Sequence, residues 1–318
     1  MASSESARRT YPAGSTISFW TAPDGWQLRR FDWPSAAATP RGSILFQGGR
    51  GDIFEKYLES FRHWHAQGWA ITSFDWRGQG GSGRLSDDPH CGDIDRFGTY
   101  LDDYGAFWRD WATTAPGPHV AIGHSMGGHL ICRALAKVLA EPVAAVLVAP
   151  MMGVHAPISA GFGERVAEIA MRLGNPQRRA WKSNERPGTT DSRQSLLTHD
   201  ADRYSDEPWW WEQKPEIRLG PPSWRWVVRA FESTRRLRAS KRVKKVKVPV
   251  LMLVADHDKL VRAADAITVA GLLPDVELVR FGKESAHEIL REVDAVRDRA
   301  LGEIDTFLSA RAKPNTGQ

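Results

Sequence analysis

Length, composition and charge exclude several classes of protein. The 318 residues are 42% hydrophobic and 25% charged, with a net charge of +5, as in ordinary globular proteins. A chain of this length can bury a large core, and its two cysteines, Cys91 and Cys132, give no disulfide framework. The longest apolar run, residues 143–152, is shorter than the about 20 residues of a membrane span, and no apolar run follows the N-terminus as in a signal peptide. We therefore expect a soluble, cytoplasmic protein.

The first half of the chain alternates short apolar strands with amphipathic helices. Residues 1–14 are small, polar and basic, and we expect them to be disordered. Residues 17–20 and 27–33 flank Asp24-Gly25, a hairpin signal. Further strands are expected at 43–47, 69–74, 119–123 and 143–149. Helices are expected at 54–67, 97–111 and 126–139.

This alternation breaks in the third quarter of the chain and then resumes. Residues 151–247 are polar, rich in Arg, Pro and Trp, and lack β runs, so we expect a helical lid insertion. Strands return at 248–255 and 276–281, followed by a last helix from Glu288 to about Ser309. The pattern predicts an α/β fold: a mostly parallel sheet with helices on both faces. Its core would be residues 15–150 and 248–310, with 311–318 as a disordered tail.

The clearest chemical motif is G-H-S-M-G at residues 123–127, which fits the G-x-S-x-G pattern of a nucleophile elbow. It lies between an expected strand and an expected helix, where a serine occupies a sharp turn. The helix N-terminus then places partial positive charge next to a developing oxyanion. The sequence therefore predicts Ser125 as the catalytic nucleophile.

A serine hydroxyl is a weak nucleophile and needs a general base, which an acid orients. In α/β-hydrolases the acid and then the histidine follow the serine in the chain. Asp256 and Asp258 both follow the strand at 248–255; we predict Asp258 as the acid and keep Asp256 as the alternative. His287 lies between the last strand and the last helix, which predicts it as the base.

Two backbone N–H groups should form the oxyanion hole. One is that of Met126, which follows the serine, and the other comes from the loop after the early strand. That loop is the glycine-rich stretch 48–52, and we predict Arg50 N–H as the second donor. The alternative is that these glycines form a plain turn.

Four stretches resemble one branch of the α/β-hydrolases. They read G-R-G-D-I-F-E-K-Y at 49–57, D-W-R-G-Q-G-G-S at 75–82, G-H-S-M-G-G at 123–128 and A-H-E-I-L-R-E at 286–292. The branch is that of lysophospholipase L2 and monoacylglycerol lipase, also labelled serine aminopeptidase S33. The chain departs from it at Gln47, where the family often has histidine. The resemblance implies hydrolysis of lipid-like esters, such as lysophospholipid or monoacylglycerol, through an acyl-serine intermediate and without a cofactor or metal.

Six tryptophans fall within the expected insertion, and their rings suit a wall for an acyl chain. We predict Trp209, Trp210 and Trp224 as substrate-binding residues; the alternative is that they form the core of the insertion itself. Eight of the thirteen residues at 235–247 are basic. That run fits either a weak peripheral contact with an anionic membrane or a solvated helix face. No nucleic-acid recognition motif accompanies it.

Two other functions remain open. An aminopeptidase of the same fold would need carboxylates in the insertion for the substrate amine, and Glu207, Glu212 and Glu216 are available. A non-catalytic scaffold would have kept the fold alone. The sequence gives no indication of the oligomeric state.

Overall fold

One eight-stranded sheet organises the computed structural model, which describes residues 5–155, 165, 169, 171, 174–181 and 193–313. Its order is β1-β2-β4-β3-β5-β6-β7-β8. The first two strands form an antiparallel hairpin, β2 pairs antiparallel with β4, and all later pairs are parallel. The strands are β1 (Thr16–Thr21), β2 (Gln27–Trp33), β3 (Gly42–Gln47), β4 (Trp69–Phe74), β5 (His119–His124), β6 (Ala144–Val148), β7 (Val250–Ala255) and β8 (Val276–Phe281). The expected mostly parallel sheet is confirmed.

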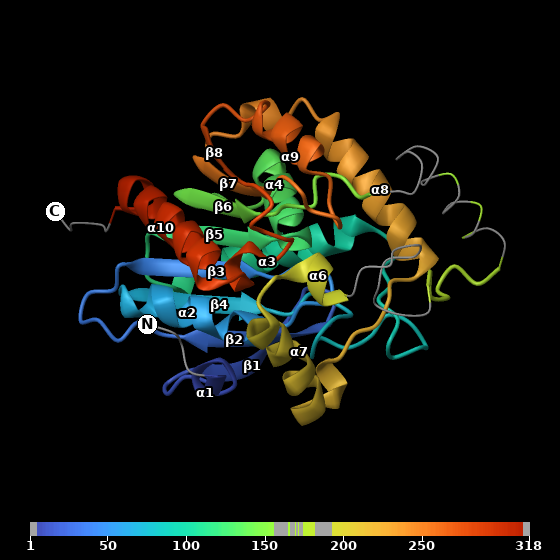
Figure 1. Ribbon diagram of the computed structural model, residues 1–318, viewed down its shortest axis with the longest axis horizontal. Coiled ribbons are helices and arrows are strands. Elements are labelled where there is room, and N and C mark those ends of the chain that lie inside the picture. Colours follow the sequence, from blue (N-terminus) through green and yellow to red (C-terminus); the bar gives the residue numbers. More distant parts are fainter. Residues whose placement is uncertain are drawn as a thin grey trace.

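Helices cover both faces of the sheet (Figure 1). Because side chains alternate along a strand, Leu45 and Met252 reach one hydrophobic cluster while Phe46 and Leu253 reach the other. The first cluster includes α3 (Phe97–Thr114), α4 (Met126–Lys137), α8 (Trp224–Arg238) and α9 (Ala263–Ala270). The second includes η1 (Phe54–Tyr57), α2 (Leu58–Ala66) and α10 (Asp294–Arg311). Strands buried on both faces explain the nearly uninterrupted apolar runs of the sequence.

Between β6 and β7 the structure describes further helices. They are α6 (Arg193–Leu197), α7 (Ala201–Gln213), η2 (Pro215–Ile217), α8 and η3 (Val243–Lys245). Side-chain caps start two of them, with Asp200 accepting from Arg203 N–H for α7 and Ser223 from Trp226 N–H for α8. Helix α8 packs directly on the core, since Ser233 bonds to His129 of α4. This part of the chain thus includes a helix that packs on the core, and a lid formed by 151–247 stays a prediction.

The N-terminal segment differs from the expectation of disorder. Residues 1–4 lie outside the described part, but Glu5–Arg8 form the short helix α1 and the segment continues along the body of the protein. Arg9 forms an ion pair with Asp206 of α7, at 3.0 Å, and the ring of Tyr11 packs on Trp210. The composition of the segment is polar, but these long-range partners, which local sequence does not reveal, hold it in place.

The C-terminal end also differs. The last helix begins at Asp294 rather than at Glu288, because Glu288 belongs to a buried turn that leads into η4 (Ile289–Arg291). At the other end α10 runs to Arg311, and Ala312 is buried against the second cluster, so the expected tail at 311–318 is ordered through Lys313. Residues 314–318 lie outside the described part. Among the helices that the structure describes, none is long and apolar enough to cross a membrane.

Candidate active site

The residues predicted to carry the chemistry follow the carboxyl ends of neighbouring parallel strands. Ser125 follows β5, Asp258 follows β7, His287 lies in the loop after β8, and the glycine-rich loop follows β3. The carboxyl ends of parallel strands meet at one edge of a sheet, where α/β folds bind ligands. Topology therefore brings together side chains that are far apart in the sequence.

The hydrogen bonds among these side chains form a chain from serine to carboxylate. Ser125 Oγ lies 2.9 Å from His287 Nε2, and His287 Nδ1 lies 2.5 Å from Asp258 Oδ2. All three residues are buried, and Ser125 retains 8% of its exposed surface. This is the spacing that proton transfer from a serine hydroxyl to an oriented imidazole requires.

The geometry favours Asp258 over Asp256 as the acid. The second oxygen of Asp258 accepts the backbone N–H groups of Leu260 and Val261, at 2.7 and 3.0 Å, which fix the carboxylate toward His287. Asp256 instead bonds to the exposed Arg280. Burial disfavours the imidazolium, but the charge and hydrogen bond of Asp258 outweigh it and raise the pKa of His287.

The turn at Ser125 has the strained backbone of a nucleophile elbow. Its φ of 51° and ψ of −115° are unfavourable for a residue with a side chain. Glycines make the turn feasible, because a Cβ on Gly127 would lie 2.3 Å from the Gln47 carbonyl oxygen. The elbow therefore packs directly against the end of β3 and the loop that follows it.

The glycine-rich loop lies against the serine. A Cβ on Gly49 would come within 3.0 Å of Ser125 Cβ. Within the described part of the chain, the backbone N–H groups of Met126 and Arg50 have no hydrogen-bond acceptor, as expected of donors kept for an oxyanion. Gln79 fixes the loop further along, since its Oε1 accepts Gly51 N–H at 2.6 Å.

Asp52, at the end of this loop, is a site residue that the sequence interpretation missed. Its Oδ2 accepts Gly49 N–H at 2.7 Å and the Tyr57 hydroxyl at 2.6 Å, and lies 3.0 Å from His124 Nδ1. His124 Nε2 in turn lies 3.3 Å from the backbone oxygen of His287. Burial opposes ionisation of Asp52, but Lys56 and His124 hold the pKa of its carboxyl well below the usual value. The carboxylate thus connects the loop, the elbow and the histidine.

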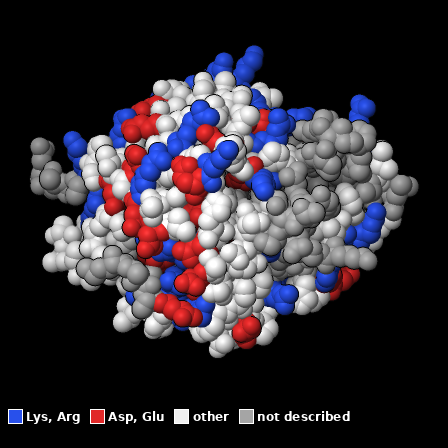
Figure 2. Space-filling view, viewed as in Figure 1, with Lys and Arg blue, Asp and Glu red and all other residues white. Residues whose placement is uncertain are grey.

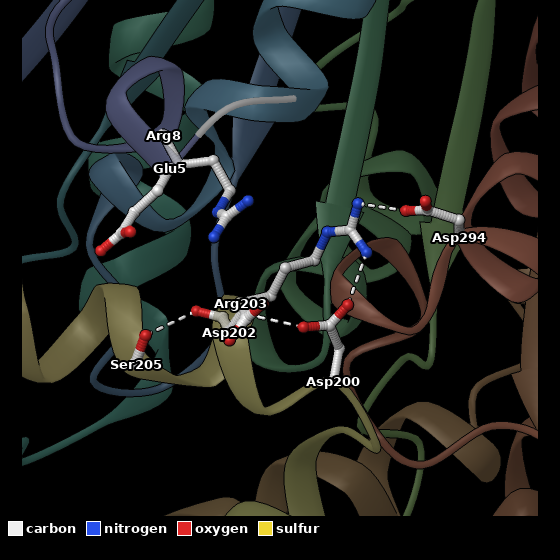
Figure 3. A pocket seen from close by; sticks show the side chains of 7 residues that line it. All are labelled: Glu5, Arg8, Asp200, Asp202, Arg203, Ser205 and Asp294. Carbon is white, nitrogen blue, oxygen red and sulfur yellow. Dashed lines mark hydrogen bonds and ion pairs between the residues drawn. The ribbon is translucent and has the colours of Figure 1, made fainter. Parts of the chain in front are cut away.

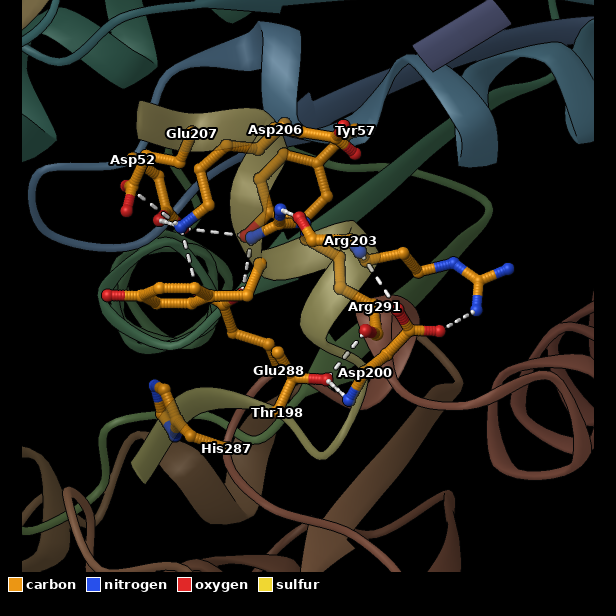
Figure 4. Close-up of polar contacts among 12 residues, drawn as sticks. Asp52, Tyr57, Thr198, Asp200, Arg203, Asp206, Glu207, His287, Glu288 and Arg291 are labelled. Carbon is orange, nitrogen blue, oxygen red and sulfur yellow. Dashed lines mark hydrogen bonds and ion pairs between the residues drawn. The ribbon is translucent and has the colours of Figure 1, made fainter. Parts of the chain in front are cut away.

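Lys56 is the centre of a buried ionic cluster beside Asp52. Figure 4 labels its carboxylate partners Asp52, Glu207 and Glu288. Its Nζ lies 2.6 Å from Asp52, 2.7 Å from Glu288 and 3.2 Å from Glu207 of α7. Burial opposes the charges, yet Lys56 and Arg291 outweigh it and lower the pKa of Glu288 to about 2. Asp52 and Lys56 are four residues apart, so a local sequence pattern could have indicated their ion pair. No local pattern indicates that Glu207 and Glu288 join it. The cluster joins the β3 loop, the histidine loop and α7.

The three tryptophans predicted to bind substrate have packing contacts within the protein. Trp210 is buried, and Trp209 meets it edge to face at 4.9 Å between centroids. Both pack with the second cluster, whereas the half-buried Trp224 packs against the first. No described contact joins any of them to the serine, histidine or acid, so their binding role stays a prediction.

A second polar feature of the protein is a cavity rich in charged side chains. Figure 2 shows acidic and basic side chains interspersed over α10, and basic ones along the upper edge of the view. A polar cavity of about 280 Å³ lies between α1, α7 and the start of α10 (Figure 3). Arg203 there pairs with Asp200 and Asp294. Because neither serine nor histidine lines this cavity, it is distinct from the candidate active site.

Comparison with known proteins identifies the family. The model of the family described as serine aminopeptidase, S33, matches residues 38–294, most of the chain. The chain belongs to this family. The chain is 30% identical over 286 residues to lysophospholipase L2 of Escherichia coli strain K12. The alignment covers 86% of this chain and 82% of the relative. It is 27% identical over 282 residues to the probable lysophospholipase L2 of Haemophilus influenzae, covering 86% and 85%.

Solved structures share the fold of this S33 family member. A monoglyceride lipase from Saccharomyces cerevisiae superposes with a TM-score of 0.75 at 17% identity, covering 95% of this chain and 98% of that one. A carboxyl esterase from Bacillus coagulans gives a TM-score of 0.73 at 17% identity, covering 94% and 99%. The resemblance to the lysophospholipase L2 and monoacylglycerol lipase branch is confirmed.

Proposed function

We propose that this protein hydrolyses carboxylic esters of lipid-like molecules, such as lysophospholipids or monoacylglycerols, through an acyl-Ser125 intermediate. The observation that carries the proposal is the hydrogen-bonded sequence Ser125, His287, Asp258, in a member of a hydrolase family. Its sequence relatives are named lysophospholipases, and a structural relative is a monoglyceride lipase.

The geometry supports a two-step mechanism. His287 Nε2 takes the proton of Ser125 as Oγ attacks the ester carbonyl carbon, and the N–H groups of Met126 and Arg50 bind the oxyanion. Collapse breaks the bond to the alcohol, which leaves with the proton from His287. A water molecule, deprotonated by His287, then attacks the acyl carbon. The bond from that carbon to Ser125 Oγ breaks, Oγ takes the proton back from His287, and the fatty acid leaves. Asp258 stabilises the imidazolium in both steps.

Aminopeptidase activity has less support. An amine-binding carboxylate must be free to face the substrate, but Glu207 is buried in ion pairs with Lys56 and Arg193. Glu212 and Glu216 are exposed on the surface. None of the three carboxylates therefore favours a substrate amine at this site.

Hydrolysis of a chain-length series of p-nitrophenyl esters tests the proposal, with aminoacyl anilides as the competing substrates. We expect ester cleavage by the wild type and a fall in kcat of about 10⁴-fold or more in Ser125→Ala. A fluorophosphonate should label the wild type and not the variant. If the wild type cleaves no ester and Ser125 resists labelling, the hydrolase proposal fails and a scaffold role gains support.

We also propose a weak contact between an anionic membrane and the basic run at 235–247. Lys241, Arg242, Lys244, Lys245 and Lys247 are all exposed there. The run leads into the start of β7, at the end of the sheet opposite the serine, so it would tether the protein without directing the active site at the bilayer. Each such cation contributes about 1 kcal/mol near an anionic surface.

Cosedimentation with phosphatidylserine vesicles tests this contact. Lys244→Glu combined with Lys245→Glu should weaken binding by about tenfold or more, and added salt should weaken wild-type binding. Vesicles of phosphatidylcholine alone are the control. Equal sedimentation of variant and wild type would contradict the tether.

A further inference from the structure

The side chain of Arg50, on the oxyanion loop, carries a positive charge. It is half-buried between the core and the insertion, where Nη1 donates to the Gly220 carbonyl oxygen at 3.0 Å. Its guanidinium lies over the ring of Trp226, 5.6 Å from the centroid. Within the described part of the chain it forms no ion pair. Its contacts hold the guanidinium in place but supply no negative charge.

Two arginines that are almost fully buried have carboxylate partners instead. Arg29 pairs with Glu55 and Asp75, and Arg77 pairs with Asp103. A buried charge without a partner is costly, so such pairing is the general rule. Burial, and then the charge of Arg193, lower the pKa of Arg50 to about 10. Arg50 therefore stays protonated at neutral pH; the charge of Asp52 attracts it through space, but among the described residues Asp52 forms no ion pair with it.

The distance of the Arg50 guanidinium from the oxyanion hole can be compared with the distance between the ester and the phosphate of a lysophospholipid. Gly49, the preceding residue, lies against Ser125, and the Arg50 N–H is the proposed second oxyanion donor. The side chain extends from there toward Gly92, where a Cβ would meet Nη1 at 3.0 Å. The guanidinium is thus separated from the oxyanion hole by the length of its own side chain. In a lysophospholipid a glycerol backbone of similar length separates the ester from the phosphate.

We propose that the Arg50 guanidinium binds the phosphate of a lysophospholipid headgroup and so favours phosphate-bearing substrates over neutral monoacylglycerols. This inference rests on the proposed ester hydrolysis. A guanidinium presents N–H groups in a planar fork that matches phosphate oxygens. With Nη1 held by Gly220, the N–H groups of Nε and Nη2 face no acceptor among the described residues. Arg193, although paired with Glu207, adds positive potential nearby.

The test compares two substrates with the same acyl chain, a lysophosphatidylglycerol and a monoacylglycerol. The measured quantity is the ratio of their kcat/KM values in the wild type and in Arg50→Met, which keeps the length of the side chain and removes its charge. A charged hydrogen bond contributes enough that we expect the ratio to fall by about tenfold or more. Arg50→Lys should restore part of it.

Arg84→Met is the matched control. Arg84 also donates to carbonyl oxygens of the insertion, those of Glu216 and Arg218, at 2.7 and 3.0 Å. If Arg50 acts only by anchoring the insertion, the ratio of kcat/KM values should fall equally in Arg50→Met and Arg84→Met. That result would overturn the proposal. An unchanged ratio in Arg50→Met, or an equal loss on both substrates, would also overturn it.

Inhibition separates a headgroup site from a general anion site. Hydrolysis of a p-nitrophenyl ester should be inhibited more strongly by glycerophosphoglycerol than by inorganic phosphate, and Arg50→Met should weaken the inhibition. Equal inhibition by the two compounds would overturn the headgroup assignment. Failure of the underlying hydrolase proposal is recognisable separately, because the wild type would then cleave none of these esters.

Discussion

At the residue scale, Asp52 shows how one buried carboxylate holds several parts of a site. Its two oxygens bond to Gly49 N–H, the Tyr57 hydroxyl and Lys56, and His124 lies within reach. Gly49 precedes the proposed oxyanion donor, so the direction of the next N–H depends on this anchor. Asp52 touches no reacting atom in the mechanism and is therefore a positioning residue.

Asp52→Asn should lower kcat more than it raises KM. The neutral amide binds Lys56 and Gly49 N–H less strongly, so the loop loses orientation, and loss of one oxyanion donor typically costs about 10²-fold in kcat. Steady-state kinetics on a p-nitrophenyl ester measures the two constants separately. Asp256→Asn is the control, because the Asp256 side chain bonds to the exposed Arg280 and, among the described residues, to no part of the site, so both constants should stay unchanged. Equal effects of the two substitutions would contradict the role of Asp52.

The pH dependence follows from His287. Its imidazole must be neutral to accept the serine proton, and Asp258 raises its pKa above the ordinary value of 6.5 despite burial. A base with a raised pKa loses activity as the pH falls through that value. We therefore expect kcat/KM for a p-nitrophenyl ester to decline on the acid side with a midpoint above 6.5. A midpoint well below 6.5 would contradict the described environment of His287.

At the scale of elements, helix α4 and strand β3 meet too closely for a side chain. A Cβ on Gly127 would lie 2.3 Å from the Gln47 oxygen and 2.6 Å from the Gly48 oxygen. These are backbone atoms, so only a shift of the helix or of the loop relieves the clash. The spacing of two elements therefore sets the geometry of the oxyanion loop.

Gly127→Ala should destabilise the fold by about 1–3 kcal/mol through overpacking. It should also lower kcat by up to about 10²-fold, because Gln47 and Gly48 lead into the oxyanion loop. Urea unfolding and ester kinetics measure the two effects. Gly302→Ala, at an exposed position of helix α10 with nothing near its added Cβ, is the control and should stabilise by about 0.4–1 kcal/mol. A stable, fully active Gly127→Ala would refute the close packing.

At the scale of the whole molecule, the N-terminal segment joins the core to the insertion. The Tyr11 hydroxyl donates to Glu55 of η1 at 2.6 Å and accepts from Lys214 at 2.9 Å. Its ring packs on Trp210 of α7, with centroids 5.0 Å apart. Helix α7 carries Glu207 into the cluster around Lys56. The segment therefore supports the helix that borders the candidate active site.

Tyr11→Ala should lower the free energy of unfolding by about 2 kcal/mol, because it removes the ring contact and both hydrogen bonds. Tyr11→Phe keeps the ring and should cost about 1 kcal/mol. Urea denaturation followed by tryptophan fluorescence measures both. An alanine variant as stable as the wild type would show that the segment does not support α7.

Features encoded in local sequence patterns could be predicted before the structure was known. Apolar runs of about strand length gave the parallel sheet, and motif order placed Ser125, Asp258 and His287 at its carboxyl edge. The burial of a central parallel strand can be predicted from its own residues, because side chains on both faces of the sheet must be apolar. The turn of a nucleophile elbow can be predicted from its glycines, because only glycine fits where two backbone segments approach closely.

The pairing of charged residues could not be predicted from the sequence, because it depends on how the elements pack in the folded protein. Lys56 and Glu288 are 232 positions apart, and nothing local in either marks the pair. The order of residues 5–14, the start of α10 at Asp294 and the packing of Trp210 likewise depend on distant partners. Periodicity states which side of an element is buried but not what it is buried against. Ion pairs and packing contacts arise between elements, so they became visible only once the chain had folded.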